Sequence, residues 1–210
     1  MKIKNKITSI ALASVLGLAG AVHGHNLDIN FNFAGEPGDQ VSTAGTSSVG
    51  AITGAIVDRG PGIGSTAAGN SISSNGWDSL DPTEDFFSFR FDIAAGFSVD
   101  IDRLVIGTRS SGAGPGELAL RYSGDGFTSD LATFTQSGTA FLNSDIALNL
   151  TELTGSVEFR VVATSDVRAD GDLGITDTGT FRLVNYFSGG DTGGITFSGT
   201  AVPEPGAYAL

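Results

Sequence analysis

Cysteine is absent from this chain of 210 residues, which excludes a disulfide framework, a thiol nucleophile and a thiolate metal site. Histidine occurs only as His23 and His25, near the start of the predicted mature protein. A Ser-His-Asp triad or a histidine zinc site inside the folded domain is therefore excluded as well. We predict a protein that uses no cofactor and holds no metal ion.

Lysine is confined to Lys2, Lys4 and Lys6, which lie in the predicted export signal. Removing that signal changes the formal net charge from −12 to −15, because 8 arginines then stand against 23 acidic residues. Nucleic acids and anionic membranes are bound through clustered positive charge, so neither is an expected partner of the mature domain. Without a lysine, a phosphate-binding P-loop is excluded too.

A sustained helical period is also missing after the signal, and apolar and polar residues alternate instead with the period of a strand. Glycine, at 31 of 210 residues, is about twice its usual share of ~7%, which suits a fold with many turns. We predict an all-β protein, an antiparallel β-sandwich or jelly roll of roughly ten short strands. The expected strands cover residues 27–33, 49–57, 87–93, 97–101, 118–122, 131–134, 140–142, 146–150, 157–161, 181–187 and 195–198.

The clearest pattern lies within residues 85–109. Phenylalanines alternate with polar residues over 87–93, and apolar residues do the same over 97–101. A three-residue loop that ends in Gly96 is typical of a β-hairpin, because glycine supplies the left-handed conformation. This hairpin would place Arg90 opposite Asp100 on its solvent-exposed face. Its apolar face would bury Phe89, Phe91, Val99 and Ile101.

The first residues have the pattern of a secretory signal peptide. A basic start is followed by an apolar run over 7–21 that is too short for a comfortable membrane span, and small residues suit cleavage after Ala21 or Gly24. A buried N-terminal helix would not account for the lysines before this run. We predict a signal peptide over 1–24, a β-sandwich domain over 25–201 and a tail over 202–210.

Carboxylates are the one abundant reactive group, and a glycosidase needs two of them, one with a raised pKa. We expect Arg90 and Arg103 to hold nearby aspartates ionised, the wrong direction for a general acid, so a hydrolase is the less favoured interpretation. The candidate carboxylates are Glu84, Asp85, Asp100, Asp102 and Glu158.

Two further groups of residues resemble ligand sites. The acidic loop 166–179 could gather carboxylates around Ca²⁺, but Gly174 stands where an EF-hand ligand belongs, so a solvated loop is the favoured interpretation. Trp77 and Tyr122 could form a platform on which a sugar stacks, although a lone tryptophan beside a strand more often belongs to the core. The four aspartates of the loop are Asp166, Asp170, Asp172 and Asp177.

The chain closes on a motif formed by Val202, Pro203, Glu204 and Pro205. Two prolines astride a glutamate predict an extended, exposed segment outside the sandwich. This end resembles the start of the PEP-CTERM sorting signal of exported proteins in exopolysaccharide-producing Gram-negative bacteria. The likeness extends back to about Asn75 and includes the segments 75–77, 86–104, 125–127, 153–160 and 179–182.

The resemblance implies an exported, non-enzymatic protein of the cell surface or the exopolysaccharide matrix, with an exosortase-type membrane protease as a partner. In that family, a membrane-spanning segment and an arginine cluster follow the Pro-Glu-Pro motif, where this sequence reaches Leu210. We therefore expect the chain as written to be exported without being retained in the membrane. The alternative function is a secreted carbohydrate-binding module, and a carboxylate-dependent glycoside hydrolase is the third.

Overall fold

The computed structural model describes residues 24–188 and 191–204. Most of the predicted signal peptide and the tail from Pro205 onward lie outside these residues. Antiparallel strands dominate, with one short 3-10 helix, η1, at Ser123–Asp125. The strands are β1 His25–Phe31, β2 Ser42–Ser47, β3 Ile52–Arg59, β4 Gly64–Ser65, β5 Ser71–Asn75, β6 Phe86–Ile93, β7 Phe97–Ser110, β8 Glu117–Tyr122, β9 Asp130–Thr135, β10 Leu142–Leu153, β11 Ser156–Ala163, β12 Phe181–Val184, β13 Tyr186–Ser188, β14 Asp191–Gly193 and β15 Ile195–Pro203.

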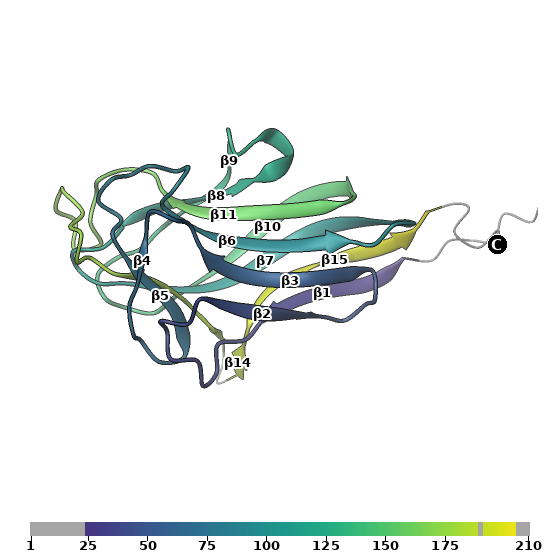
Figure 1. Cartoon of the computed structure of the whole chain (residues 1–210), viewed down its shortest axis with the longest axis horizontal. Helices are drawn as coiled ribbons and strands as arrows, with labels where there is room; N and C mark the ends of the chain where they lie inside the picture. The colour runs from purple at the N-terminus through teal and green to yellow at the C-terminus, as the bar shows by residue number, and fades with distance from the viewer. Residues whose placement is uncertain (1–23, 189–190, 205–210) are drawn as a thin grey trace, which may run out of the picture.

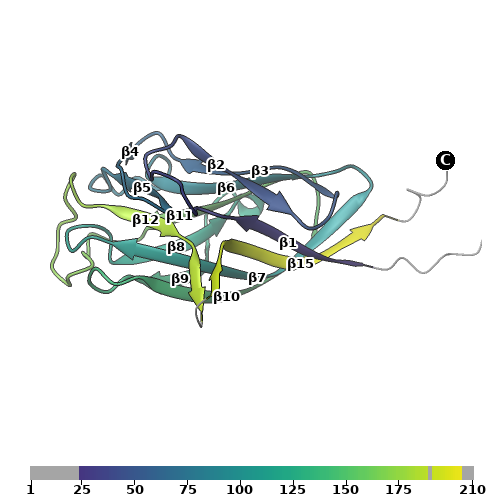
Figure 2. The ribbon, with the colours of Figure 1, turned by 90° about the horizontal axis from the view of Figure 1, so that it is seen from below.

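The strands form two facing layers joined at β2 (Figures 1 and 2). Their hydrogen-bonded order is β4-β5-β12-β7-β15-β1-β2-β3-β6-β11-β8-β9, and β10 pairs with the remaining edge of β7. The first layer contains β1, β5, β7, β10, β12 and β15, and the second contains β3, β6, β8, β9 and β11. The predicted β-sandwich is therefore confirmed, although it has more strands than the ten expected.

Aromatic side chains fill the space between the two layers. Phe197 of β15 lies at their centre, with its ring centroid 4.7 Å from that of Phe159 and 5.4 Å from that of Phe89. Phe31 and Phe91 complete the group at 6.5 and 6.3 Å from Phe197. All five rings are almost fully buried, so they join β1 and β15 of one layer to β6 and β11 of the other.

The predicted hairpin between β6 and β7 is wrong, because these strands belong to opposite layers. β6 pairs with β3 and β11, whereas β7 pairs with β10, β12 and β15. The loop 94–96 is therefore an arch that crosses between the layers, with Gly96 at φ 84° and the Phe97 amide donating to the Ala94 carbonyl. An arch turns the same alternate residues toward the core as a hairpin does. The four predicted apolar residues are accordingly buried: Phe89, Phe91, Val99 and Ile101.

The end of the sandwich also differs from the prediction, since β15 continues through Val202 and Pro203. Pro203 is buried and lies opposite Phe97 of β7. The amide of Glu204 donates to the Gly96 carbonyl on the β7 side at 2.8 Å. Because neighbouring strand residues point their amides in opposite directions, the nitrogen of Pro203 faces away from β7. There β1 begins only opposite Ala201, so the missing N–H breaks no ladder hydrogen bond.

Candidate functional site

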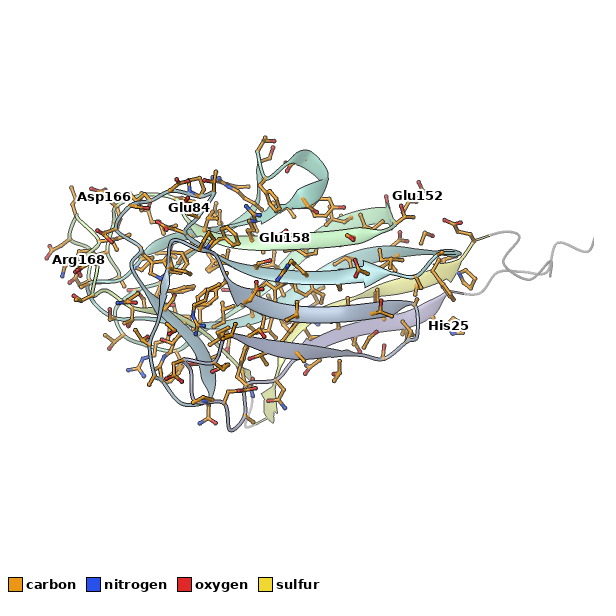
Figure 3. The ribbon with its side chains drawn as sticks, viewed as in Figure 1. His25, Glu84, Glu152, Glu158, Asp166 and Arg168 are labelled. Atoms are coloured by element: carbon orange, nitrogen blue, oxygen red, sulfur yellow. The ribbon has the colours of Figure 1, made fainter. Side chains whose placement is uncertain are left out.

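A shallow groove of about 550 Å³ crosses the outer face of the second layer. Its floor is formed by β3, β6 and β11. Phe89 and Phe91 of β6 and Phe159 of β11 point into the core, and Arg90, Asp92 and Glu158 point out. Glu158 lies in the middle of this face (Figure 3). The residues that line the groove are Gly54, Ile56, Arg90, Phe91, Asp92, Ser123, Ser156, Val157 and Glu158.

Asp58 and Arg90 form an ion pair on neighbouring strands beside this groove. The side chain of Arg90 is 49% exposed and that of Asp58 is 22% exposed. Burial raises the pKa of Asp58 above its ordinary value, Arg90 opposes this shift, and the nearby charge of Glu158 adds to it. The raised pKa of Asp58 is the shift that a general acid needs. Its carboxylate, however, is already paired with Arg90.

Glu158 and Arg160 form a second ion pair, with 2.6 Å between Oε1 and Nε. The same carboxylate accepts a hydrogen bond from the Ser88 hydroxyl at 3.1 Å. The guanidinium of Arg160 lies between two rings, with its central carbon 3.9 Å from the centroids of both Phe86 and Phe127. Cation–π contacts with both rings hold this arginine in place, which in turn fixes Glu158.

The polar groups of the groove are thus held mainly by one another. Asp92, at its edge, accepts a hydrogen bond from the Ser156 hydroxyl at 2.5 Å. Such a surface presents rigid donors and acceptors to a ligand that lies across the strands. Glu158 in the groove and Asp58 beside it both have arginine partners, which favours binding over proton transfer.

No protein-family model matches the chain, and a search of the curated proteins found no match either. Among solved structures, a carbohydrate-binding module, CBM36 in complex with calcium and xylotriose, is similar. The two share 17% sequence identity, and the match covers 58% of this chain and 87% of that one with a TM-score of 0.30. A likeness this weak carries no argument about function.

The carboxylates proposed from the sequence do not form one site. Asp100 lies on β7, in the layer opposite Glu158, and accepts a hydrogen bond from the Glu152 amide at 2.8 Å. Asp85 is buried and accepts hydrogen bonds from the Ser79 hydroxyl and the Asp81 amide, so it organises its own loop. The predicted pairing of Arg90 with Asp100 is wrong, because Arg90 binds Asp58.

The tryptophan–tyrosine platform does not form. Trp77 is fully buried, with its ring centroid 5.8 Å from that of Phe87 and 5.6 Å from that of Phe181. Its indole N–H donates to the Ser74 hydroxyl at 2.9 Å. Tyr122 instead stacks on Phe159, with 5.2 Å between their ring centroids. The interpretation of Trp77 as a core residue is confirmed.

The acidic loop 166–179 lies at the end of the molecule remote from His25 (Figure 3). Asp170 pairs with Arg168, and the Asp170 carboxylate also accepts the Asp172 amide at 3.1 Å. Among the described residues, no three acidic or histidine side chains are grouped as ligands of a metal ion. The same part of the chain contains no helix with the length and hydropathy of a membrane span.

Sequence reasoning missed Asp58, Arg160 and Phe127. Asp58 follows the glycine-interrupted start of β3, and its partner Arg90 is brought beside it only by the pairing of β3 with β6. Phe127 has a positive φ of 62° just after the turn at η1, where a sequence pattern predicts no orientation. The alternation of Val157, Phe159 and Val161 is the one signal that places Glu158 and Arg160 together on an outer face.

Proposed function

We propose that this chain is an exported, non-enzymatic β-sandwich that works at the cell surface or in an exopolysaccharide matrix. The groove across β3, β6 and β11 is its binding surface for polysaccharide. The observation that carries this proposal is the mutual pairing of Asp58 with Arg90 and of Glu158 with Arg160. Carboxylates that are already paired act as fixed hydrogen-bond acceptors, which suits sugar hydroxyls.

The proposal includes export through the N-terminal signal and processing at the C-terminal motif by an exosortase-type protease. β1 begins at His25 beside the end of β15, so the first and last described residues lie at one end of the sandwich. Pro203 is held in the sheet, whereas Glu204 is exposed. A protease that recognises this motif would therefore reach it from Glu204 onward.

Fractionation of a Gram-negative host tests export. We expect the full chain outside the cytoplasm and not retained in membranes, and we expect a variant without residues 2–21 to stay in the cytoplasm. Recovery of the full chain from the cytoplasm would refute export. Firm association with membranes would refute our interpretation of the tail.

A glycan array tests binding by the groove. Asp92→Asn changes the hydrogen bonding at the edge of the groove, whereas Asp102→Asn changes an exposed aspartate on β7 in the other layer. On neutral glycans, we expect the Asp92 variant to lose binding and the Asp102 variant to keep it. Equal effects of the two variants, or no bound neutral glycan, would contradict a binding role for the groove.

A second candidate, a carboxylate-dependent glycoside hydrolase, is favoured by one observation. Burial raises the pKa of Asp58 while Glu158 lies close enough to influence it. Release of reducing ends from polysaccharides tests this candidate, and Asp58→Asn is the variant that should remove the activity. Activity that is present in the natural chain and absent from the variant would replace the non-enzymatic proposal.

A further inference from the structure

Two arginines lie directly opposite each other on the outer face of the first layer. Arg109 of β7 pairs in register with Arg182 of β12, and the residues on both sides of each point into the sandwich. Like charges at directly opposed positions of a sheet destabilise it. Burial, together with the charge of Arg109, lowers the pKa of Arg182 below its ordinary value.

Neither arginine has a carboxylate partner among the side chains that the structure describes. Arg59 is held by the backbone carbonyls of Gly38, Gln40 and Ser73. The five arginines with carboxylate partners are Arg90, Arg103, Arg121, Arg160 and Arg168. In a chain with 23 acidic residues and 11 basic ones, two adjacent unpaired guanidiniums are an unfavourable arrangement that an anionic ligand would relieve.

The two arginines line a hollow of about 280 Å³ whose other walls carry hydroxyl groups. The Nε of Arg109 donates to the Thr139 carbonyl at 2.7 Å, which fixes the base of this guanidinium. Ser73 of β5 pairs in register with Arg182, and the hydroxyls of Ser73 and Thr66 lie 2.8 Å apart. The hollow therefore offers guanidinium donors together with hydroxyl groups that can both donate and accept.

An aromatic ring stands beside the arginines. The guanidinium carbons of Arg109 and Arg182 lie 4.6 and 5.3 Å from the ring centroid of Phe141. Phe141 is 53% exposed, which is unusual for phenylalanine in this protein. The ring orders both guanidiniums through cation–π contacts and keeps apolar surface open beside them. Bidentate arginine, hydroxyl groups and an open ring are together suited to a sugar that carries a carboxylate.

We propose that this hollow, lined by Arg109, Arg182 and the adjacent hydroxyls with Phe141 beside the arginines, binds the carboxylate of a uronic acid residue in an acidic polysaccharide. The sugar carboxylate binds between the two guanidiniums and neutralises part of their positive charge. The site lies on the layer opposite the groove, so either site can fail its test while the other stands.

Calorimetry with galacturonate oligosaccharides and the full purified chain tests the proposal. We expect Arg182→Gln to weaken binding by about tenfold or more, since it removes the charge-assisted hydrogen bonds of one guanidinium to the carboxylate. The matched control is Arg103→Gln, which removes the same charge from the outer face of β7 outside the hollow, where Arg103 pairs with Asp145. This control should bind as the natural chain does, and an equal loss in both variants would overturn the proposal.

Three further ligands separate a uronate from other sources of negative charge. Arg182→Gln should leave any binding of neutral galactose oligosaccharides unchanged, since these have no carboxylate for the guanidiniums. Inorganic phosphate and short DNA should bind at least about tenfold more weakly than galacturonate, because neither presents a sugar carboxylate to the ring and the hydroxyls. Binding of phosphate or DNA as tight as that of galacturonate, or an equal loss of neutral-sugar binding in Arg182→Gln, would overturn the assignment.

Thermal unfolding separates a binding role from a structural one. At low ionic strength, Arg182→Gln should melt at the same temperature as the natural chain or higher, because it removes a like-charge pair. Galacturonate should raise the melting temperature of the natural chain and leave that of the variant unchanged. A variant that melts lower than the natural chain without ligand would indicate that Arg182 has a structural role, and this too would overturn the proposal.

Discussion

Truncation of Phe197 to alanine should destabilise the protein more than the same change at an exposed phenylalanine. The ring is fully buried between the layers and contacts four other rings, from Phe31, Phe89, Phe91 and Phe159. Replacing a buried phenylalanine by alanine costs about 3–5 kcal/mol. We expect the upper part of that range, because each aromatic pair adds about 0.5–1.5 kcal/mol beyond its buried area.

This loss is large against the total stability of a domain, which is about 5–15 kcal/mol. For a domain of this size, each kcal/mol shifts the melting temperature by about 2–4 °C, so we expect a decrease of roughly 6–20 °C. Urea unfolding followed by circular dichroism gives the free energy directly. If the alanine variant does not fold, Phe197→Leu keeps much of the volume and should lie between it and the natural chain.

Phe141→Ala is the matched control, since Phe141 is 53% exposed on the first layer. We expect this control to cost no more than about 1 kcal/mol, mainly the cation–π contacts to the two arginines. Equal losses from the two alanine variants would refute the argument that Phe197 joins the layers.

The remaining predictions concern a carboxyl, the acidic loop and the arch. Because burial raises the pKa of Asp58, the folded state binds the proton more tightly, and the free energy of unfolding should fall as pH rises from about 3.9 through the raised pKa. Urea titrations at several pH values should show this fall relative to Asp58→Asn; a rise would contradict it. Micromolar Ca²⁺ should leave the melting temperature of the chelator-treated protein unchanged, whereas a clear upward shift would indicate a calcium site in the loop 166–179. A peptide of residues 85–103 should show no hairpin cross-peaks by NMR, because β6 and β7 pair with other strands; cross-strand contacts between Phe91 and Val99 would contradict this.

Buried faces of strands could be predicted from the sequence because period-2 alternation is a local property. Phe89 and Phe91 of β6 and Val99 and Ile101 of β7 are buried as the pattern predicts. Their partners could not be predicted, since an arch and a hairpin turn the same residues inward. The choice between them depends on β3, β11, β10 and β15, which occupy the edges of both strands and come from distant parts of the chain.

β5 was missed for a different reason. Its residues Ser71, Ile72, Ser73 and Ser74 are all buried, so the strand shows no alternation of apolar and polar residues. The serines are tolerated there because their hydroxyls have partners, such as the Trp77 indole N–H for Ser74. A short strand stabilised by hydroxyl groups resembles a polar loop in composition, so the sequence predicts no strand between residues 57 and 87.

The two candidate surfaces depend on strand register in the same way. Arg90 reaches Asp58 because β3 lies beside β6, and Arg109 meets Arg182 because β12 lies beside β7. Each of these pairs joins residues far apart in the sequence, so the pairs cannot be predicted from composition. Composition shows only that 23 carboxylates are available to eight arginines. On average every arginine should then find an acidic partner. An adjacent pair that finds none therefore reflects how this fold aligns its strands, and this is why we assign the missing negative charge to a ligand.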